Sequence, residues 1–336
     1  MSTGKKIAIL AIVCLVATSV FAVFIIKNGS FLSGDKEVPH DGKWGIYILD
    51  LETKKIELVY SSANMISRIR LNNAGDQLAF CQQIGNGSEC VVEDSPVSPC
   101  CEICSISVDG DDYRRLTDNV YGDLLPCWSE DDSQIAFLSF RETMDVFMMD
   151  ADGDNMRLVY DSGVHDSDLH CSNGKIAFTR ESQIWMMNED GTAATQVTDP
   201  PRAAEKGNAI LPFGDYDPNL SPDGSRIVFE RMVDDATVHG NYDIYLINVD
   251  GSGETALTDN GYTQGLAVWS HSGEQIAYIV SAIENEGKYD LYLMNSDGSE
   301  NRDITPEYFP ADLLCYDPIF SGDDTSVFFV GEWYLD

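Results

Sequence analysis

The sequence has few basic side chains. Lysine and arginine together number 21 among 336 residues, whereas aspartate and glutamate number 56, giving a formal net charge of −35 at pH 7. A surface this acidic repels phosphate groups, so we expect no nucleic-acid partner, and it disfavours contact with anionic lipid. The acidity suits high salt, divalent cations or a basic partner, and most of the carboxylates are expected simply to remain in water.

The residue types that carry nucleophilic and metal chemistry are also scarce. The chain has five histidines, and no Gly-x-Ser-x-Gly motif of the kind that presents a hydrolase nucleophile. His165 and His170 lie close together in the sequence, but their spacing is neither helical nor typical of a zinc site. We therefore expect no enzyme activity, and ordinary polar loop residues explain the histidine pair better than a catalytic metal does.

One long apolar run stands near the N-terminus, at residues 7–26, and only two hydroxyl residues interrupt it. A helix of that length spans about 30 Å, the thickness of the bilayer core. Lys5 and Lys6 precede the run, which favours a cytoplasmic N-terminus and an exported remainder. A cleaved signal peptide is the alternative, and it would leave the protein secreted.

The remainder of the chain alternates two patterns, and each recurs six times. The first joins an apolar residue, a polar turn and an Ile-Ala-Phe-like triplet, and its copies begin at Leu71, Trp128, Cys171, Leu220, Trp269 and Phe320. The second joins an aromatic-centred strand, an Asp-Gly turn and a Leu-Thr strand, and its copies begin at Ile46, Ile106, Val146, Ile184, Ile244 and Leu291. Each pattern predicts a β-hairpin, because Asp-Gly tolerates positive φ and the flanking residues favour strands.

The order of the two patterns predicts how the hairpins assemble. Two hairpins make a four-stranded blade, and blades stack around an axis because one blade cannot bury both of its faces. The chain begins with the second half of a blade (46–60) and ends with the first half of one (317–330), and between them lie five whole blades, at about 66–117, 127–160, 168–198, 217–258 and 267–305. Pairing of the two half-blades would complete a sixth blade and remove the open edge.

The predicted fold is therefore all-β: a six-bladed β-propeller with four-stranded blades, preceded by one N-terminal transmembrane helix. We expect residues 1–27 to form the signal-anchor helix, 28–44 a linker and 45–336 the propeller. The protein would be a single-pass membrane protein that carries its propeller on the extracytoplasmic side.

Two segments carry a resemblance to a known family. The string Leu-Ser-Pro-Asp-Gly-Ser-Arg-Ile-Val-Phe at 220–229 and the string Ile-Tyr-Leu-Ile-Asn-Val-Asp-Gly at 244–251 resemble the repeats of TolB-like propellers, also called PD40 or WD40-like repeats. The resemblance covers about 46–330 and is specific for the fold, whereas fold alone does not determine function. Relatives include a protein-binding component of a periplasmic envelope complex and the propeller domains of prolyl-oligopeptidase-type peptidases. The resemblance implies a propeller that binds proteins.

A group of aspartates accompanies the first strands of several blades. Its members are Asp123, Asp166, Asp168, Asp215, Asp217 and Asp317. Because first strands line the axis of a propeller, we expect these carboxylates to ring one mouth of the channel. They would suit Ca²⁺ or another divalent cation, or a basic peptide segment. The alternative is that they cap strands and turns and remain solvated.

The cysteines indicate disulfides. Eight of the nine lie outside the predicted anchor, and an even number in an exported protein favours pairing. Five of them surround an insertion, about 82–102, that has no counterpart in the other repeats: Cys81, Cys90, Cys100, Cys101 and Cys104. We expect at least one disulfide among these five, with its connectivity open. Cys101-x-x-Cys104 as a redox pair or half of a metal site is the alternative.

The leading functional hypothesis is a membrane-anchored, non-enzymatic module that binds a protein or peptide partner, with no certain cofactor. A second insertion, 200–215, precedes a first strand near the expected channel mouth and is a candidate partner contact. Two alternatives stay open at this point: a glycan-directed lyase or hydrolase that uses the channel mouth, and a purely structural envelope protein.

Overall fold

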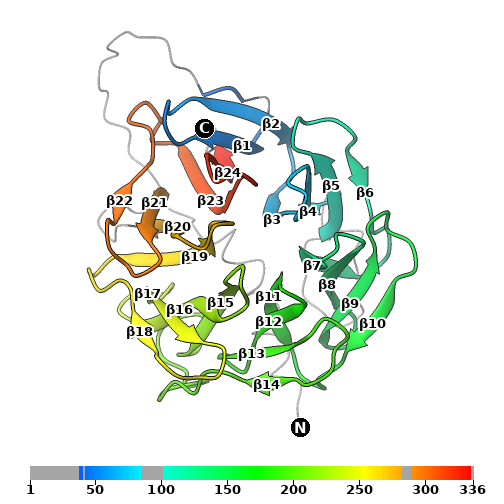
Figure 1. Cartoon of the computed structure of the whole chain (residues 1–336), viewed down its shortest axis with the longest axis vertical. Helices are drawn as coiled ribbons and strands as arrows, with labels where there is room; N and C mark the ends of the chain where they lie inside the picture. Colours follow the sequence, from blue (N-terminus) through cyan, green and yellow to red (C-terminus); the bar gives the residue numbers. More distant parts are fainter. Residues whose placement is uncertain (1–37, 41, 85–100, 282–288, 334–336) are drawn as a thin grey trace.

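The computed structural model describes residues 38–40, 42–84, 101–281 and 289–333, and these form a ring of six four-stranded sheets (Figure 1). The prediction of an all-β, six-bladed propeller with four-stranded blades is confirmed. No helical segment within these ranges has the length and apolarity that a membrane crossing requires. The predicted anchor, residues 1–27, lies outside them.

Five blades follow one another along the chain, and each runs from an inner strand beside the axis to an outer strand at the rim (Figure 1). Blades 1 and 2 contain β3 (Ile66–Leu71), β4 (Gln77–Gln83), β5 (Cys101–Ser107), β6 (Arg114–Arg115), β7 (Gly122–Trp128), β8 (Gln134–Phe140), β9 (Met144–Asp150) and β10 (Arg157–Tyr160). Blades 3 and 4 contain β11 (Asp166–Ser172), β12 (Lys175–Arg180), β13 (Gln183–Asn188), β14 (Thr195–Gln196), β15 (Asp215–Leu220), β16 (Arg226–Asp234), β17 (Asn241–Asn248) and β18 (Thr255–Ala256). Blade 5 contains β19 (Thr263–Trp269), β20 (Gln275–Ser281), β21 (Tyr289–Asn295) and β22 (Arg302–Asp303).

Blade 6 joins the two ends of the propeller. Its strands are β23 (Leu313–Phe320), β24 (Ser326–Trp333), β1 (Trp44–Asp50) and β2 (Ile56–Ser62), in the order β2-β1-β24-β23. β1 pairs with β24 over its whole length, from Trp44 opposite Glu332 to Asp50 opposite Ser326. The Trp333 indole N–H also donates a hydrogen bond of 2.8 Å to the Tyr47 hydroxyl. The two half-blades of the sequence therefore close the ring, as predicted.

The Leu-Thr pattern of the sequence has a structural cause. In blades 1, 3, 4 and 5 the threonine follows the outer strand, and its hydroxyl oxygen accepts a hydrogen bond from a backbone N–H of the third strand. The donor and acceptor residues are Ile103 and Thr117, Ile184 and Thr198, Ile244 and Thr258, and Leu291 and Thr305, at 2.8–2.9 Å. This bond holds the short outer strand against the blade.

The propeller has two unlike faces. The turn face carries the turns between first and second strands and between third and fourth strands, whereas the loop face carries the links between second and third strands and between blades. Nine aspartates at the turns accept a hydrogen bond from the backbone N–H two residues further on: Asp50, Asp109, Asp131, Asp152, Asp190, Asp223, Asp250, Asp297 and Asp323. At Asp223, hydrogen bonds from Ser221 and Ser225 lower the pKa to about 2. Part of the negative charge of the chain therefore stabilises turns.

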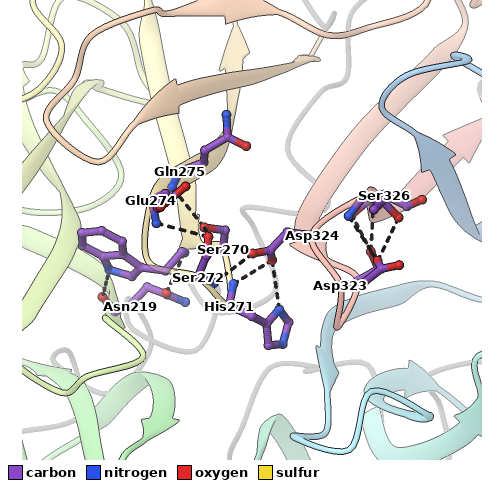
Figure 2. A network of polar contacts seen from close by, with 12 residues as sticks. Asn219, Ser270, His271, Ser272, Glu274, Gln275, Asp323, Asp324 and Ser326 are labelled. Carbon is purple, nitrogen blue, oxygen red and sulfur yellow. Dashed lines mark hydrogen bonds and ion pairs between the residues drawn. The ribbon is translucent and has the colours of Figure 1, made fainter.

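Side chains on the turn face also link neighbouring blades. Figure 2 shows Asp324, in the turn between β23 and β24, beside the turn between β19 and β20. Its carboxylate accepts hydrogen bonds of 2.8 Å from the backbone N–H groups of His271 and Ser272. On the other side of blade 5, the Trp269 indole N–H donates to the carbonyl oxygen of Asn219 at 3.1 Å. The Trp-Ser start of this repeat therefore ties blade 5 to blade 4.

A disulfide connects two inner strands. Cys127 on β7 and Cys171 on β11 are bonded, and their Cα atoms lie 5.5 Å apart. Neither belongs to the group of cysteines that the sequence singled out. In that group Cys81, Cys101 and Cys104 are buried in blade 1, whereas Cys90 and Cys100 lie outside the described residues, so a bridge in the insertion stays a prediction. Burial raises the pKa of Cys104 to about 11, which disfavours the thiolate that a redox pair would need.

We expect the disulfide to contribute substantially to stability. It closes a loop of 44 residues, for which chain entropy predicts a stabilisation of about 4 kcal/mol. The variant Cys127→Ala, Cys171→Ala should unfold at a correspondingly lower urea concentration. Reduction of the wild-type protein is the matched control, since it breaks the bond without removing the sulfur atoms. If neither treatment shifts the unfolding midpoint, the bridge does not form in solution.

Candidate functional site: the channel and the loop face

Each inner strand carries a β-bulge at the same place. The bulged residues have left-handed backbone, with φ between 47° and 57°, and they are Arg68, Leu125, Asp168, Asp217, Leu266 and Asp317. A bulge re-aims the side chain of its strand, and all of these except Leu125 line one small cavity on the axis. The fold therefore brings together residues that are far apart in the sequence.

The predicted ring of six aspartates divides into two sets of three. Asp168, Asp217 and Asp317 occupy bulge positions and line the channel cavity. The other three, Asp123, Asp166 and Asp215, lie two positions earlier on their strands and are fully buried. The six belong to the inner strands themselves rather than to the loops before them.

The second set bonds to its own blades. The carboxylate of Asp166 accepts a hydrogen bond from Arg180 Nε at 2.8 Å, and that of Asp215 accepts one from Arg231 Nε at 2.6 Å. Asp123 accepts a hydrogen bond of 2.6 Å from Asn119 Nδ2. These three carboxylates hold strand starts in place and are not among the residues that line the channel cavity. Their complete burial differs from the alternative reading of the sequence, which left them solvated.

The channel contains a cation from the chain itself. Arg68 pairs through Nη1 with Asp217, its Nη2 lies 3.9 Å from Asp168, and its backbone N–H donates to Asp317 at 2.7 Å. Burial lowers the pKa of Arg68, but the three carboxylates outweigh this effect and the pKa is raised. Arg68 was not among the residues predicted from the sequence. It could have been identified from its position in the repeat, because Arg68 occupies in the first blade the place that an aspartate occupies in three other blades.

A fourth carboxyl group, Glu230 on β16, joins the cluster. Burial raises the pKa of Glu230 well above its usual range, and the charge of Asp217 raises it further. Burial also raises the pKa of Asp168 to about 6, with Asp217 again adding to the shift. Glu230 has room because its neighbour on β19 is Gly265, where a Cβ atom would lie 2.3 Å from Glu230 Oε2. The raised pKa values favour the neutral form of these carboxyl groups, and Arg68 offsets the charge of those that are ionised.

The two histidines singled out in the sequence do not share a site. The Nδ1 atom of His165 accepts a hydrogen bond of 3.1 Å from the backbone N–H of Met144, whereas that of His170 accepts one of 3.0 Å from Leu220. Burial lowers the pKa of His170 to about 3. Across the described ranges, no group of three or more His, Cys, Asp or Glu side chains is arranged to hold a metal ion.

The loop face collects exposed apolar side chains. Among the described residues eight large hydrophobic side chains are exposed, and six of them lie on this face: Val120, Val164, Ile210, Val233, Val238 and Tyr262. The other two, Tyr113 and Leu158, lie at the rim beside or on outer strands. Among the described turns of the turn face, only that of blade 1 contributes one, Tyr113. The described links of the loop face are also acidic, with ten carboxylates (Asp118, Glu142, Asp161, Glu181, Asp199, Glu205, Asp235, Asp259, Glu307 and Asp312) against three basic side chains (Arg141, Arg202 and Lys206).

The second insertion builds a raised part of this face on blade 4. Phe213 is buried with Tyr216, Met232 and Tyr242. The backbone N–H of Ile210 donates a hydrogen bond of 2.9 Å to the carbonyl oxygen of Val238, so two exposed apolar residues from different links are held side by side. The insertion is therefore packed onto the blade and presents an ordered surface.

Comparison with known proteins places the fold. No family model matches the chain. An uncharacterized protein of Agrobacterium fabrum is 27% identical over 165 residues, which are 45% of this chain and 53% of that protein, so the match spans about half the length of the relative. The structure of a protein assigned as TolB from Agrobacterium tumefaciens superposes with a TM-score of 0.65 at 16% identity, over 88% of this chain and 99% of that one.

Two further structures have a similar fold. TolB from Acinetobacter baumannii gives a TM-score of 0.52 at 15% identity, over 80% of this chain and 64% of that chain. An oligogalacturonate lyase in complex with manganese gives 0.53 at 12% identity, over 86% of this chain and 83% of that chain. At these identities the likeness concerns the fold.

The buried carboxylates predict how stability depends on pH. Folding raises the pKa of Asp168 and that of Asp123, each by burial and each to about 6. The folded state therefore binds these protons more tightly, and the stabilisation is complete below the unfolded pKa near 4 and is lost as pH rises through about 6. Turn aspartates such as Asp223 act in the opposite sense, but only below about pH 4. His170 also acts in the opposite sense, because burial lowers its pKa to about 3 and the unfolded state therefore binds a proton more tightly below about pH 6.5.

We therefore expect Asp168 and Asp123 each to stabilise the fold by roughly 1.4 kcal/mol more at about pH 5 than at about pH 7.5, because only about one unit of each pKa shift lies in this window. Urea unfolding at the two pH values measures the effect as the difference between the wild-type protein and Asp168→Asn, in which His170 is unchanged. A pH dependence that is the same in Asp168→Asn as in the wild type would contradict the raised pKa of Asp168.

Proposed function

We propose that this chain, which has the six-bladed TolB-like propeller fold, is a non-enzymatic module that binds a protein or peptide partner on its loop face. The main support is the placement of exposed apolar side chains, because six of the eight among the described residues lie on that one face. Scattered single hydrophobic residues need no explanation, but a concentration on one face is typical of an interaction surface.

The chemistry of the loop face indicates the kind of partner. On the loop face, exposed apolar side chains are surrounded by the acidic side chains of the links. This combination matches the apolar centre and polar rim of protein interfaces. Ten carboxylates against three basic side chains in the described links favour a partner segment with positive charge, since complementary charge speeds encounter and disfavours wrong partners. We infer a basic, partly apolar protein segment as the ligand.

The rigidity of the surface supports binding as well. The insertion on blade 4 is fixed by the buried Phe213 and by the backbone bond between Ile210 and Val238. A surface that is ordered before the partner arrives loses less conformational entropy on binding. Elsewhere in the ring, the Cys127–Cys171 bridge fixes blade 2 to blade 3.

We further propose that residues 1–27 anchor the propeller on the extracytoplasmic side of a membrane. The apolar run at 7–26 and the lysines before it support the anchor and its orientation. The Cys127–Cys171 disulfide supports an oxidising compartment for the folded part.

The alternative of a glycan-directed lyase or hydrolase rests on likeness of fold to the oligogalacturonate lyase. In the channel of this chain the bulge carboxylates are engaged by Arg68, and the Nδ1 atoms of His165 and His170 accept hydrogen bonds from the backbone. The geometry therefore favours binding over catalysis.

Charge introduced into the apolar part of the loop face should abolish binding. The variant Ile210→Glu, Val238→Glu, made in the full-length chain, is expected to reduce the partner captured by cross-linking from the native envelope fraction by about tenfold or more. The matched control is Ala193→Glu, which adds one charge to an exposed turn on the opposite face. Capture that survives the loop-face substitutions, or that is lost equally in the control, would contradict the assignment of the face.

The anchor is tested separately. We expect the full-length chain to remain with membranes after carbonate extraction, and its propeller to be digested by protease added outside intact spheroplasts. Leu15→Arg with Val16→Arg should release the protein from the membrane, because two charges at the centre of the run oppose insertion by several kcal/mol. Protection of the propeller until the cells are lysed would show the opposite orientation.

A further inference from the structure

Blade 2 differs from its neighbours where its third strand begins. In blades 1 and 4 an acidic residue at this place, Glu102 or Asp243, accepts a hydrogen bond from the threonine that follows the outer strand. The bonds join Thr117 to Glu102 at 2.5 Å and Thr258 to Asp243 at 3.2 Å. The strand register gives Asp145 as the corresponding residue of blade 2, because it pairs with Ser139 as Glu102 pairs with Gln82.

Asp145 has no such donor. The residue at the threonine position of blade 2 is Tyr160, which pairs with Val146. Its ring packs towards blade 3, where the ring centroids of Tyr160 and Phe178 lie 6.0 Å apart. Asp145 Oδ2 accepts a hydrogen bond of 2.8 Å from Thr143, but Oδ1 has no partner. The residue is 8% exposed, so the missing bond is a real cost, because a buried polar atom without a partner destabilises the fold.

This carboxyl group lines a groove at the rim of blade 2. The other lining residues are Arg141, Glu142, Thr143, Phe147, Met156, Arg157, Leu158 and Asp161. Leu158 is 51% exposed although it is apolar. Burial raises the pKa of Asp145, and the charge of Asp161 adds to the effect. Within the described part of the chain neither carboxylate has an ion-pair partner.

Two basic side chains line the groove, Arg141 and Arg157, and both are directed elsewhere. The Arg141 guanidinium lies over the ring of Phe147 at 4.1 Å and over that of Tyr121 at 4.7 Å. Arg157 Nη2 donates a hydrogen bond of 3.3 Å to Gln134 Oε1. The groove is lined by three carboxylates, Glu142, Asp145 and Asp161, and Asp145 has an unmade hydrogen bond next to an exposed apolar wall.

We propose that this groove binds an arginine side chain of the protein partner. Its aliphatic stem would lie along Met156 and Leu158, and its guanidinium would donate to Asp145 and Asp161. A guanidinium fits this set because its planar array of donors supplies the missing hydrogen bond and offsets both negative charges. The inference rests on the proposed function, since Thr143 and Asp161 belong to links of the loop face.

The test uses the full-length protein and two small probes, N-acetyl-arginine amide and its neutral counterpart N-acetyl-citrulline amide, with affinity measured by NMR titration. We expect the arginine probe to bind about tenfold or more tightly than the citrulline probe. Asp145→Asn should remove that preference. Asp243→Asn is the matched control, because the equivalent carboxylate in blade 4 already has Thr258 as its donor, and it should leave the preference unchanged.

Equal binding of the two probes, or equal loss in Asp145→Asn and Asp243→Asn, would overturn the proposal. If Asp145→Asn does not fold, as judged by near-UV circular dichroism, the exposed Asp161→Asn decides, with a loss of about threefold or more expected and an unchanged preference counting against the groove. The outcome is separable from that of the partner capture. A partner lost from the loop-face variant without a probe preference refutes the groove alone, whereas a probe preference with an unaffected partner refutes the proposed binding face.

Discussion

The pairing of β1 with β24 is the constraint on which the rest of the molecule depends. A blade can bury its faces only between two other blades, so the ring has to close before any blade is fully packed. Seven residue pairs from Trp44–Glu332 to Asp50–Ser326 close it, and the Trp333 to Tyr47 hydrogen bond strengthens the same seam. Closure also fixes the channel, because β23 brings Asp317 next to Arg68 of blade 1. The internal charge cluster exists only in the closed ring.

The acidity of the chain has several physical roles. At the turn face, aspartates accept backbone hydrogen bonds, and one of them, Asp324, joins two blades. Inside the blades, Asp166 and Asp215 are matched by Arg180 and Arg231. At the axis, Arg68 contacts three carboxylates, those of Asp168, Asp217 and Asp317. The links of the loop face and the groove of blade 2 add carboxylates such as Asp145 and Asp161, which have no ion-pair partner among the described residues, and we propose that these select a basic partner.

The candidate site was only partly predictable. The sequence identified Asp168, Asp217 and Asp317 as channel residues, but it grouped them with Asp123, Asp166 and Asp215, which face into the blades. Alternation along a strand places residues at i and i+2 on one face, and the bulge that separates the two sets cannot be read from residue types. Glu230 was missed for a related reason, since its approach to the axis depends on the absence of a side chain at Gly265 on another blade. The Cys127–Cys171 bridge joins different blades, and the repeat pattern carries no information about such contacts.

The sequence by itself determined the number of blades, their four-stranded form and the closure by half-blades from both ends. These follow from local physics: strand-forming runs, Asp-Gly turns and a repeat that occurs six times. Only the tertiary structure decided which carboxylates meet at the axis, which cysteines pair and where a carboxylate, Asp145, is buried without the threonine donor that its counterparts have. Those outcomes depend on distances between blades and on the direction of individual side chains, and a one-dimensional pattern records neither.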